Sequence, residues 1–183
     1  MRIGAPDILN ASILIVDDQE SNISLLERLL GEAGYTRVAS TMNPQEVWAL
    51  HRKNGYDLIL LDLQMPGMDG FQVMAALKTN ESDSYLPVIV LTAQPAHSLR
   101  ALQTGAKDFI SKPFDLLEVK TRIHNMLEVR LLHKKLENYN KVLEQRTLHD
   151  STTGLPNRDL FDDRLTHAIA LAKRHTLSTG VQG

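Results

Sequence analysis

The stretch YDLILLDLQMPGMDG, residues 56–70, decides the fold class of this chain. It contains a short, continuous apolar run at residues 58–61 that ends on an acid, Asp62, before the chain turns sharply through the sequence MPG. An apolar run of this length, bounded by turn residues, is typical of a strand buried on both faces. The central question is therefore why such a strand finishes on an acid, and what that acid does.

Strand-like runs alternate with helix-like stretches up to about residue 125. The predicted strands span residues 13–18, 37–41, 57–63, 87–93 and 108–114. After the first of them, Ile23, Leu26 and Leu30 recur at helical spacing, and Gly34 supplies a stop. Five repeats of strand then helix predict an α/β fold, with a doubly wound five-stranded parallel sheet that helices cover on both faces.

The composition of the 183-residue chain is that of a soluble globular protein, with 43% hydrophobic and 23% charged residues. The net charge of -2 gives no electrostatic case for binding nucleic acid or a membrane. The absence of cysteine excludes disulfides and thiolate metal sites. No apolar run approaches the ~20 residues of a membrane span, and the first residues lack the apolar core of a signal peptide. We therefore expect a cytoplasmic protein.

Unusual polar residues stand at the ends of four predicted strands. Their positions along the chain are Asp17, Asp18, Asp62, Thr92 and Lys112. In open α/β sheets, ligands bind beyond the carboxyl ends of the strands, next to the point where the strand order reverses. Taken singly, a strand-end Asp is usually a cap, a Lys before Pro a surface residue, and a strand Thr a packing residue. Their coincidence at one edge of a sheet instead predicts a single site.

Three clustered carboxylates repel one another unless a cation lies between them, so this site is expected to hold a hard divalent metal. Oxygen-only ligands favour Mg²⁺ over zinc. A metal, a lysine and a hydroxyl that face one carboxylate make a receptacle for a phosphoryl group. Asp62 would then attack as the nucleophile and form an acyl phosphate.

Four motifs carry a resemblance to a known family. ILIVDDQE, DLILLDLQMPGMDG, PVIVLTA and DFISKPF follow one another in the order and spacing of the receiver domain of bacterial two-component response regulators. The resemblance covers residues 11–130, with residues 1–10 as an N-terminal extension, and implies the flavodoxin-like receiver fold. It also implies that Asp62 is the phosphoacceptor and that its partner is a histidine kinase or a phosphotransfer protein.

The resemblance further assigns roles to the residues around Asp62. Mg²⁺ would be held by Asp18, Asp62 and the backbone carbonyl of Gln64, with Asp17 acting mainly through water. In the family, residues in the positions of Thr92 and Lys112 hold phosphoryl oxygens.

Two more features of the site are implied by the same resemblance. The peptide bond between Lys112 and Pro113 would be cis, which is plausible because proline follows. Phe109 falls at the family's switch position, where a ring turns inward after the Thr92 hydroxyl has moved toward the phosphoryl group. The alternative for Phe109 is a core aromatic with no switching role.

A long helix is predicted over residues 115–149, which contain neither Gly nor Pro. At ~1.5 Å per residue it would be ~52 Å long, more than a receiver needs to cover its sheet. Apolar residues in its second half step by 3, 4, 3 and 4, the spacing of a coiled-coil seam: Val129, Leu132, Leu136, Tyr139 and Leu143. We expect residues 131–149 to be a coiled-coil linker that joins a homodimer; the alternative is packing against a downstream domain or the receiver.

The segment HDSTTGLPNRDLFDDRLTHAIALAKRH, residues 149–175, resembles the start of GGDEF domains, the family that makes cyclic di-GMP. The matching residues are Asp150, Thr153, Gly154, Leu155, Asn157 and Arg158, while Thr152 replaces the usual Leu. Residues 150–183 are thus expected to be a truncated N-terminal fragment of a GGDEF-like output domain. The alternative is a generic capped helix.

These expectations combine into one reading: a receiver that controls the dimer geometry of an output related to cyclic di-GMP. The activities expected of this chain are phosphoryl transfer onto itself and self-dephosphorylation, whereas a full-length protein could be a diguanylate cyclase. One rival is an Asp/Mg²⁺-dependent phosphatase, although Gln64 stands where that class places a second Asp. The other rival is a dimerisation scaffold that is never phosphorylated.

Overall fold

The structure, a computed structural model, describes residues 3–80 and 85–148. In this part of the chain no helix has the length and apolar character needed to cross a membrane. The strands are β1 (Ser12–Val16), β2 (Arg37–Thr41), β3 (Leu58–Asp62), β4 (Val88–Thr92) and β5 (Asp108–Ser111). The helices are α1 (Ala5–Leu9), α2 (Glu20–Glu32), the 3-10 turn η1 (Pro44–Glu46), α3 (Val47–Asn54), α4 (Gly70–Asn80), α5 (Pro95–Thr104) and α6 (Leu116–Leu148). The chain divides into two units, residues 1–134 and 135–183, and the sheet belongs to the first.

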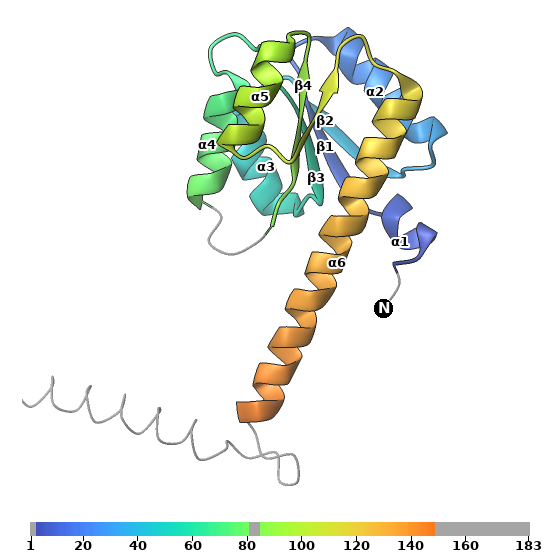
Figure 1. Cartoon of the computed structure of the whole chain (residues 1–183), viewed down its shortest axis with the longest axis vertical. Coiled ribbons are helices and arrows are strands. Elements are labelled where there is room, and N and C mark those ends of the chain that lie inside the picture. Colours follow the sequence, from blue (N-terminus) through green and yellow to red (C-terminus); the bar gives the residue numbers. More distant parts are fainter. Residues whose placement is uncertain (1–2, 81–84, 149–183) are drawn as a thin grey trace, which may run out of the picture. The chain divides into compact units, whose positions relative to one another are not determined.

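The five strands form one parallel sheet in the order β2-β1-β3-β4-β5 (Figure 1). This confirms the predicted doubly wound fold, because the strand order reverses between β1 and β3. Every residue of β1, β3 and β4 is buried. Continuous apolar runs are the expected sequence of strands that are covered on both faces.

Each face of the sheet has its own core. Leu58 and Leu60 of β3 pack on one face with residues of α1, α2 and α6, while Ile59 and Leu61 pack on the other with residues of α3, α4 and α5 (Figure 1). Alternate side chains of a strand point to opposite faces, so both halves of the apolar run are used. Each fully buried leucine or isoleucine contributes roughly 1.5–3 kcal/mol to folding.

The predicted strand boundaries need correction at the functional edge. The strand expected over residues 108–114 ends at Ser111, and residues 112–114 form a loop in which the Lys112–Pro113 peptide is cis, as the resemblance implied. The first strand ends at Val16, so Asp17 already lies in a loop. Asp17 and Lys112 therefore stand on loops that leave the sheet, whereas Asp62 and Thr92 are the last residues of their strands.

Residues 1–10, expected to be an extension, contain α1, which contributes to the core. Ile8 is only 3% exposed and packs in the same cluster as Leu127 of α6. The local signals are Pro6 in the first turn and Asp7, whose carboxylate accepts a hydrogen bond from the Gly4 amide at 3.1 Å. The sequence prediction overlooked this helix because it is only five residues long.

The long helix is present as α6, which is 33 residues long. Its first half buries Val119, Ile123 and Leu127 against the sheet. The five residues of the predicted dimer seam are 40–58% exposed: Val129, Leu132, Leu136, Tyr139 and Leu143. The predicted GGDEF-like segment, residues 150–183, lies outside the described residues.

Candidate functional site

The ends of four strands bring the predicted site residues to one edge of the sheet. Asp17 follows β1 and Asp62 ends the neighbouring strand β3; Thr92 ends β4, and Lys112 follows β5. One carboxylate oxygen from each of Asp17, Asp18 and Asp62 lies within 4.8 Å of the others. The expected acidic cluster is therefore present, and a lysine lies beside it.

Asp17 is fully buried and uses both carboxylate oxygens. Oδ1 accepts hydrogen bonds from the backbone amide of Gln19 at 2.9 Å and from Nδ2 of Asn22 at 3.0 Å. Nδ2 of Asn22 also lies 3.1 Å from Oδ2, which pairs with Nζ of Lys112 at 2.9 Å. Sequence reasoning missed Asn22; its only signal is its position in the first turn of the helix that follows the two acids.

Asp62 is 2% exposed and lies between a positive and a negative group. Its Oδ2 is 3.3 Å from Nζ of Lys112, and its Oδ1 accepts a hydrogen bond from the Gln64 amide at 3.2 Å. Burial raises the pKa of Asp62 above its ordinary value, and the charge of Asp17 adds to this effect. Lys112 and the Gln64 amide oppose it. Lys112 therefore favours the ionised, nucleophilic form of this carboxylate.

The donor set of the cluster fits a magnesium ion. Oδ1 of Asp18 is buried and has no hydrogen-bond partner among the residues that the structure describes. Most buried polar atoms in proteins have a hydrogen-bond partner, so this oxygen is well suited to bind a metal ion or a water molecule. Mg²⁺ prefers carboxylate, carbonyl and water oxygens, which are the donors available here.

The Thr92 hydroxyl is buried and bonds to the loop that begins α5. It accepts a hydrogen bond from the Gln94 amide at 3.0 Å and donates one to the Gln94 carbonyl at 3.1 Å. The Thr92 carbonyl accepts a bond from the Lys112 amide at 2.8 Å. The backbone thus ties these two site residues together, although the hydroxyl itself is directed at Gln94.

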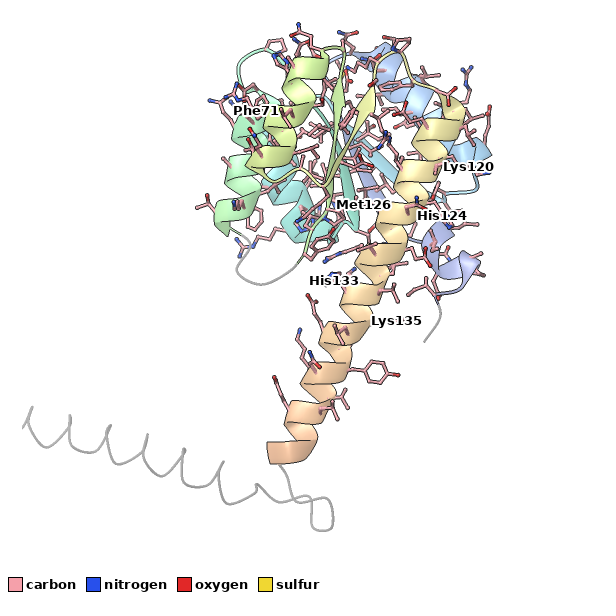
Figure 2. All side chains as sticks on the ribbon, viewed as in Figure 1. Phe71, Lys120, His124, Met126, His133 and Lys135 are labelled. Atoms are coloured by element: carbon pink, nitrogen blue, oxygen red, sulfur yellow. The ribbon has the colours of Figure 1, made fainter. Side chains whose placement is uncertain are left out.

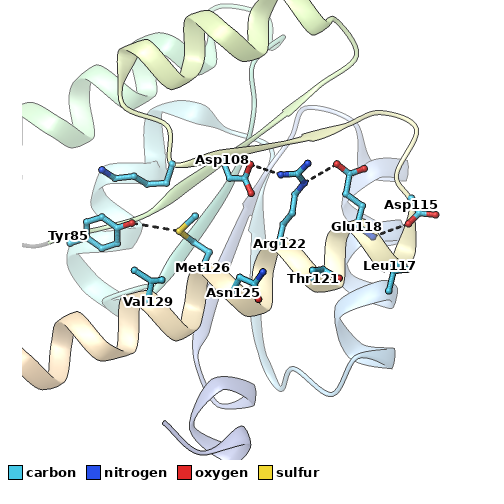
Figure 3. Close-up of a pocket in the computed structure, with 11 residues that line it drawn as sticks. Tyr85, Asp108, Asp115, Leu117, Glu118, Thr121, Arg122, Asn125, Met126 and Val129 are labelled. Carbon is cyan, nitrogen blue, oxygen red and sulfur yellow. Dashed lines mark hydrogen bonds and ion pairs between the residues drawn. The ribbon is translucent and has the colours of Figure 1, made fainter. Parts of the chain in front are cut away.

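Phe109 is partly buried and lies opposite Val90 in the pairing of β4 with β5. The guanidinium of Arg122, from α6, lies 5.2 Å from the centre of its ring. Figure 3 shows Arg122 between two acids, Asp108 at 2.7 Å and Glu118 at 2.9 Å. These contacts, the hydrogen bond to Asp108 first among them, raise the pKa of Arg122. Arg122, Asp108 and Glu118 line an open pocket of about 640 Å³ between β5 and α6. The sequence did not predict this pocket.

Gly70 allows the start of α4 to approach the strand end that carries Asp62. A Cβ atom at this position would lie 2.5 Å from the carbonyl oxygen of Asp62 and 2.9 Å from Cα of Leu63. Both atoms belong to the backbone, so no side-chain rotation can relieve the contact. The glycine is therefore part of the architecture of the site.

Comparison with known proteins gives consistent matches. The response regulator receiver domain family matches residues 13–124. The response regulator PleD of Caulobacter vibrioides is 36% identical over 130 residues, covering 70% of this chain and 28% of PleD. A probable cyclic di-GMP phosphodiesterase of Vibrio cholerae is 31% identical over 177 residues, covering 95% of this chain and 39% of that protein. The chain therefore spans well under half the length of both relatives.

Among solved structures, a putative response regulator from Chloroflexus aurantiacus superimposes with a TM-score of 0.61 and 31% identity, covering 64% of this chain and 98% of that chain. The chemotaxis protein CheY4 of Vibrio cholerae gives a TM-score of 0.56 and 28% identity, covering 62% of this chain and 98% of that one. The likeness to both structures spans nearly all of each of them and about two thirds of this chain.

Proposed function

The chain belongs to the response regulator receiver domain family, and from this premise we propose that Asp62 accepts a phosphoryl group from a histidine kinase or a phosphotransfer protein. The observation that carries the proposal is the contact of one ammonium group, Nζ of Lys112, with the carboxylates of both Asp17 and Asp62. Phosphoryl transfer requires charge neutralisation around a correctly placed nucleophile, and little else from the protein. In this proposal Asp62 is the nucleophile and Lys112 supplies the neutralising charge.

In the proposed reaction, a carboxylate oxygen of Asp62 attacks the phosphorus atom of a phosphohistidine. The new oxygen–phosphorus bond forms as the phosphorus–nitrogen bond breaks, and the electron pair leaves with the histidine nitrogen. Asp62 must be ionised to attack, and Lys112 offsets the effect of burial on its pKa. The Lys112 ammonium and the Thr92 hydroxyl would then contact the oxygens of the transferred group.

Mg²⁺ would neutralise negative charge on the phosphoryl oxygens when bound. Asp18, Asp62 and the Gln64 carbonyl would hold it, with Asp17 acting through water. Support for this division comes from the hydrogen bonds of the two neighbouring acids. Both oxygens of Asp17 already accept bonds from protein groups, whereas Oδ1 of Asp18 accepts none from the described residues.

The switch would couple Thr92 to Phe109. Reaching a phosphoryl group on Asp62 requires the Thr92 hydroxyl to leave Gln94, which changes the loop that starts α5. Phe109 has no hydroxyl, so its response would be read through packing alone. Acyl phosphate would thereby shift the population between two arrangements of the surface formed by α5, β5 and α6.

For the output, we propose a homodimer joined through residues 131–149 as a coiled-coil linker, followed by a GGDEF-like domain that begins at residue 150. Support comes from the exposed apolar stripe on α6 and from the alignment with the Vibrio cholerae protein, which covers 95% of this chain. That relative carries a cyclic di-GMP activity in its name. Phosphorylation would control the dimer geometry of such an output.

The proposal is tested by incubating the chain with acetyl phosphate and Mg²⁺ and measuring intact mass. We expect a phosphoryl adduct in the wild type and in Glu32→Gln, a variant of an exposed acid at the end of α2, but not in Asp62→Asn. Loss of the adduct on removing Mg²⁺ would support the metal site. A wild-type chain that forms no adduct would instead favour the rival reading of a dimerisation scaffold.

A further inference from the structure

Asp57 is a buried acid at the end of β3 opposite to Asp62. Its Oδ2 accepts hydrogen bonds from the Ser12 amide at 2.9 Å and from the Ser12 hydroxyl at 3.1 Å, and its Oδ1 pairs with Nζ of Lys134. Burial would raise the pKa of Asp57, but the bonds from Lys134 and Ser12 together outweigh burial and lower it. Asp57 is therefore an anion held by β1 on one side and by α6 on the other.

A second set of contacts holds the same part of α6. The ring of His133 stacks on that of Tyr85, with centroids 4.6 Å apart and planes at 16° (Figure 2 labels His133). Arg130 is 4% exposed and donates to the Tyr85 carbonyl, and the Tyr85 hydroxyl contacts Sδ of Met126 at 3.8 Å (Figure 3). We call Asp57, Tyr85, Arg130, His133 and Lys134 the basal clamp.

The strand β3 joins the acidic cluster to the basal clamp. Asp62 is its last residue and Asp57 directly precedes its first. The five strand residues are all buried; residues 58–61 pair with β1 on one side and residues 59–62 pair with β4 on the other. At about 3.3 Å per residue the two carboxylates belong to positions roughly 16 Å apart along a strand that is hydrogen-bonded on both edges. A close-packed strand of this kind has low compressibility and transmits strain along its length.

We propose that β3 and the Asp57–Lys134 pair couple phosphorylation of Asp62 directly to α6, by a route that involves neither Thr92 nor Phe109. The inference rests on the proposed function, because it names how phosphorylation of Asp62 is transmitted. Asp57 and Lys134 are positioning residues in this account. Coupling between two sites is reciprocal, so loosening the Lys134 contact must also change how strongly the Asp62 site holds a phosphoryl mimic.

A purely structural anchor makes a different prediction. If the pair only fastens α6 to the sheet, Lys134→Gln lowers stability and speeds amide exchange in α6, but it leaves the response to Asp62 modification unchanged. The two accounts therefore differ in how Lys134→Gln responds to modification of Asp62, and not in how stable the variant is. Lys120→Gln is the matched control, since Lys120 is an exposed lysine on the same helix.

The test is hydrogen exchange, followed by mass spectrometry, of a peptide covering residues 126–134, with and without beryllofluoride and Mg²⁺. In the wild type and in Lys120→Gln, we expect the mimic to change exchange in this peptide by roughly fivefold or more. In Lys134→Gln, the mimic still binds in an Asp62-dependent manner, but the change falls below about twofold and the affinity for the mimic shifts by roughly fivefold. Asp57→Asn, which keeps the shape of the side chain, gives the same result.

The outcomes distinguish the two proposals. A wild-type chain that does not bind the mimic overturns the proposed function and the coupling with it. Binding with no exchange response in residues 126–134, or with the same response in Lys134→Gln as in the wild type, overturns the coupling alone. An affinity for the mimic that is identical in Lys134→Gln and Lys120→Gln also overturns it.

Discussion

The Asp62 side chain is nearly inaccessible to water and has an ammonium group on one side and a second carboxylate on the other. Its surroundings favour the protonated form more than water does, so its pKa in the folded chain is raised, chiefly by burial. An acid whose pKa is raised in the folded chain lowers stability when it is ionised.

Asp62→Asn is accordingly expected to be more stable than the wild type at neutral pH without metal, because the ionised carboxylate is destabilised by burial. A raised folded-state pKa gives a stabilisation that is fully present below the unfolded pKa and is lost as pH rises through the folded pKa. The advantage of the Asn variant should therefore grow with pH above about 4. Urea unfolding across a pH series measures it, with the exposed-acid variant Glu32→Gln as the control. A stability advantage of Asp62→Asn that is constant with pH would contradict the explanation. Mg²⁺ should reduce the difference in stability between the two chains, because it would bind and stabilise the wild type.

Individual site residues differ in how far the sequence reveals them. Asp17, Asp62 and Lys112 could be predicted because each stands at a strand end, and parallel strands gather their carboxyl ends at one edge. Asn22 and Arg122 could not, since their contacts depend on how closely a helix packs against the sheet. No local pattern in the sequence encodes that distance.

At the scale of elements, the junction between β3 and α4 is constrained by the backbone. The helix begins at Gly70, directly against the carbonyl of Asp62. The Asp69 amide donates to Oε1 of Gln72, and the Gln72 amide donates to Oδ1 of Asp69, each at 2.9 Å. These two hydrogen bonds fix the first turn of α4. The loop that carries Gln64 therefore has both of its ends held in place, one by the end of β3 and the other by the start of α4. The position of the Gln64 carbonyl depends on this closure.

Gly70→Ala should destabilise the fold by about 1–3 kcal/mol, because the new methyl group collides with backbone atoms that cannot rotate away. The matched control is Gly31→Ala in α2, where a Cβ meets nothing within 4 Å. That change should be neutral or stabilising by up to about 1 kcal/mol. Thermal or urea unfolding of both variants measures the difference. Equal stability of the two variants would show that the start of α4 can shift.

The elements themselves were largely predictable, and the exceptions have physical causes. The residues of β2 were predicted without error, and the buried strands were found because their apolar runs are unbroken. The strand β5 was predicted three residues too long, although Pro113, a residue that strands admit mainly at their edges and ends, was an available signal. The helix α1 is too short for its periodicity to stand out.

At the scale of the whole molecule, charged side chains cluster near both ends of β3, and α6 continues beyond the receiver to Leu148. The acidic cluster lies at the carboxyl edge of the sheet and the basal clamp at the other end of β3. The helix α6 carries Lys134 and, further along, apolar residues that remain exposed. Under the proposed coupling, a phosphoryl group on Asp62 would affect α6, the helix that also carries this exposed apolar stripe.

If that stripe is a dimer seam, the double variant Leu136→Ser/Leu143→Ser should raise the dimer dissociation constant by ~100-fold or more. Each leucine buried at an interface contributes roughly 1.5–3 kcal/mol, and a twofold dimer loses every contact twice. Sedimentation velocity over a range of concentrations measures this. Val142→Ser is the control, since Val142 is also exposed, at 46%, but lies beside the seam, so it should shift the constant only a few-fold. A wild-type chain that stays monomeric with and without beryllofluoride would exclude the seam.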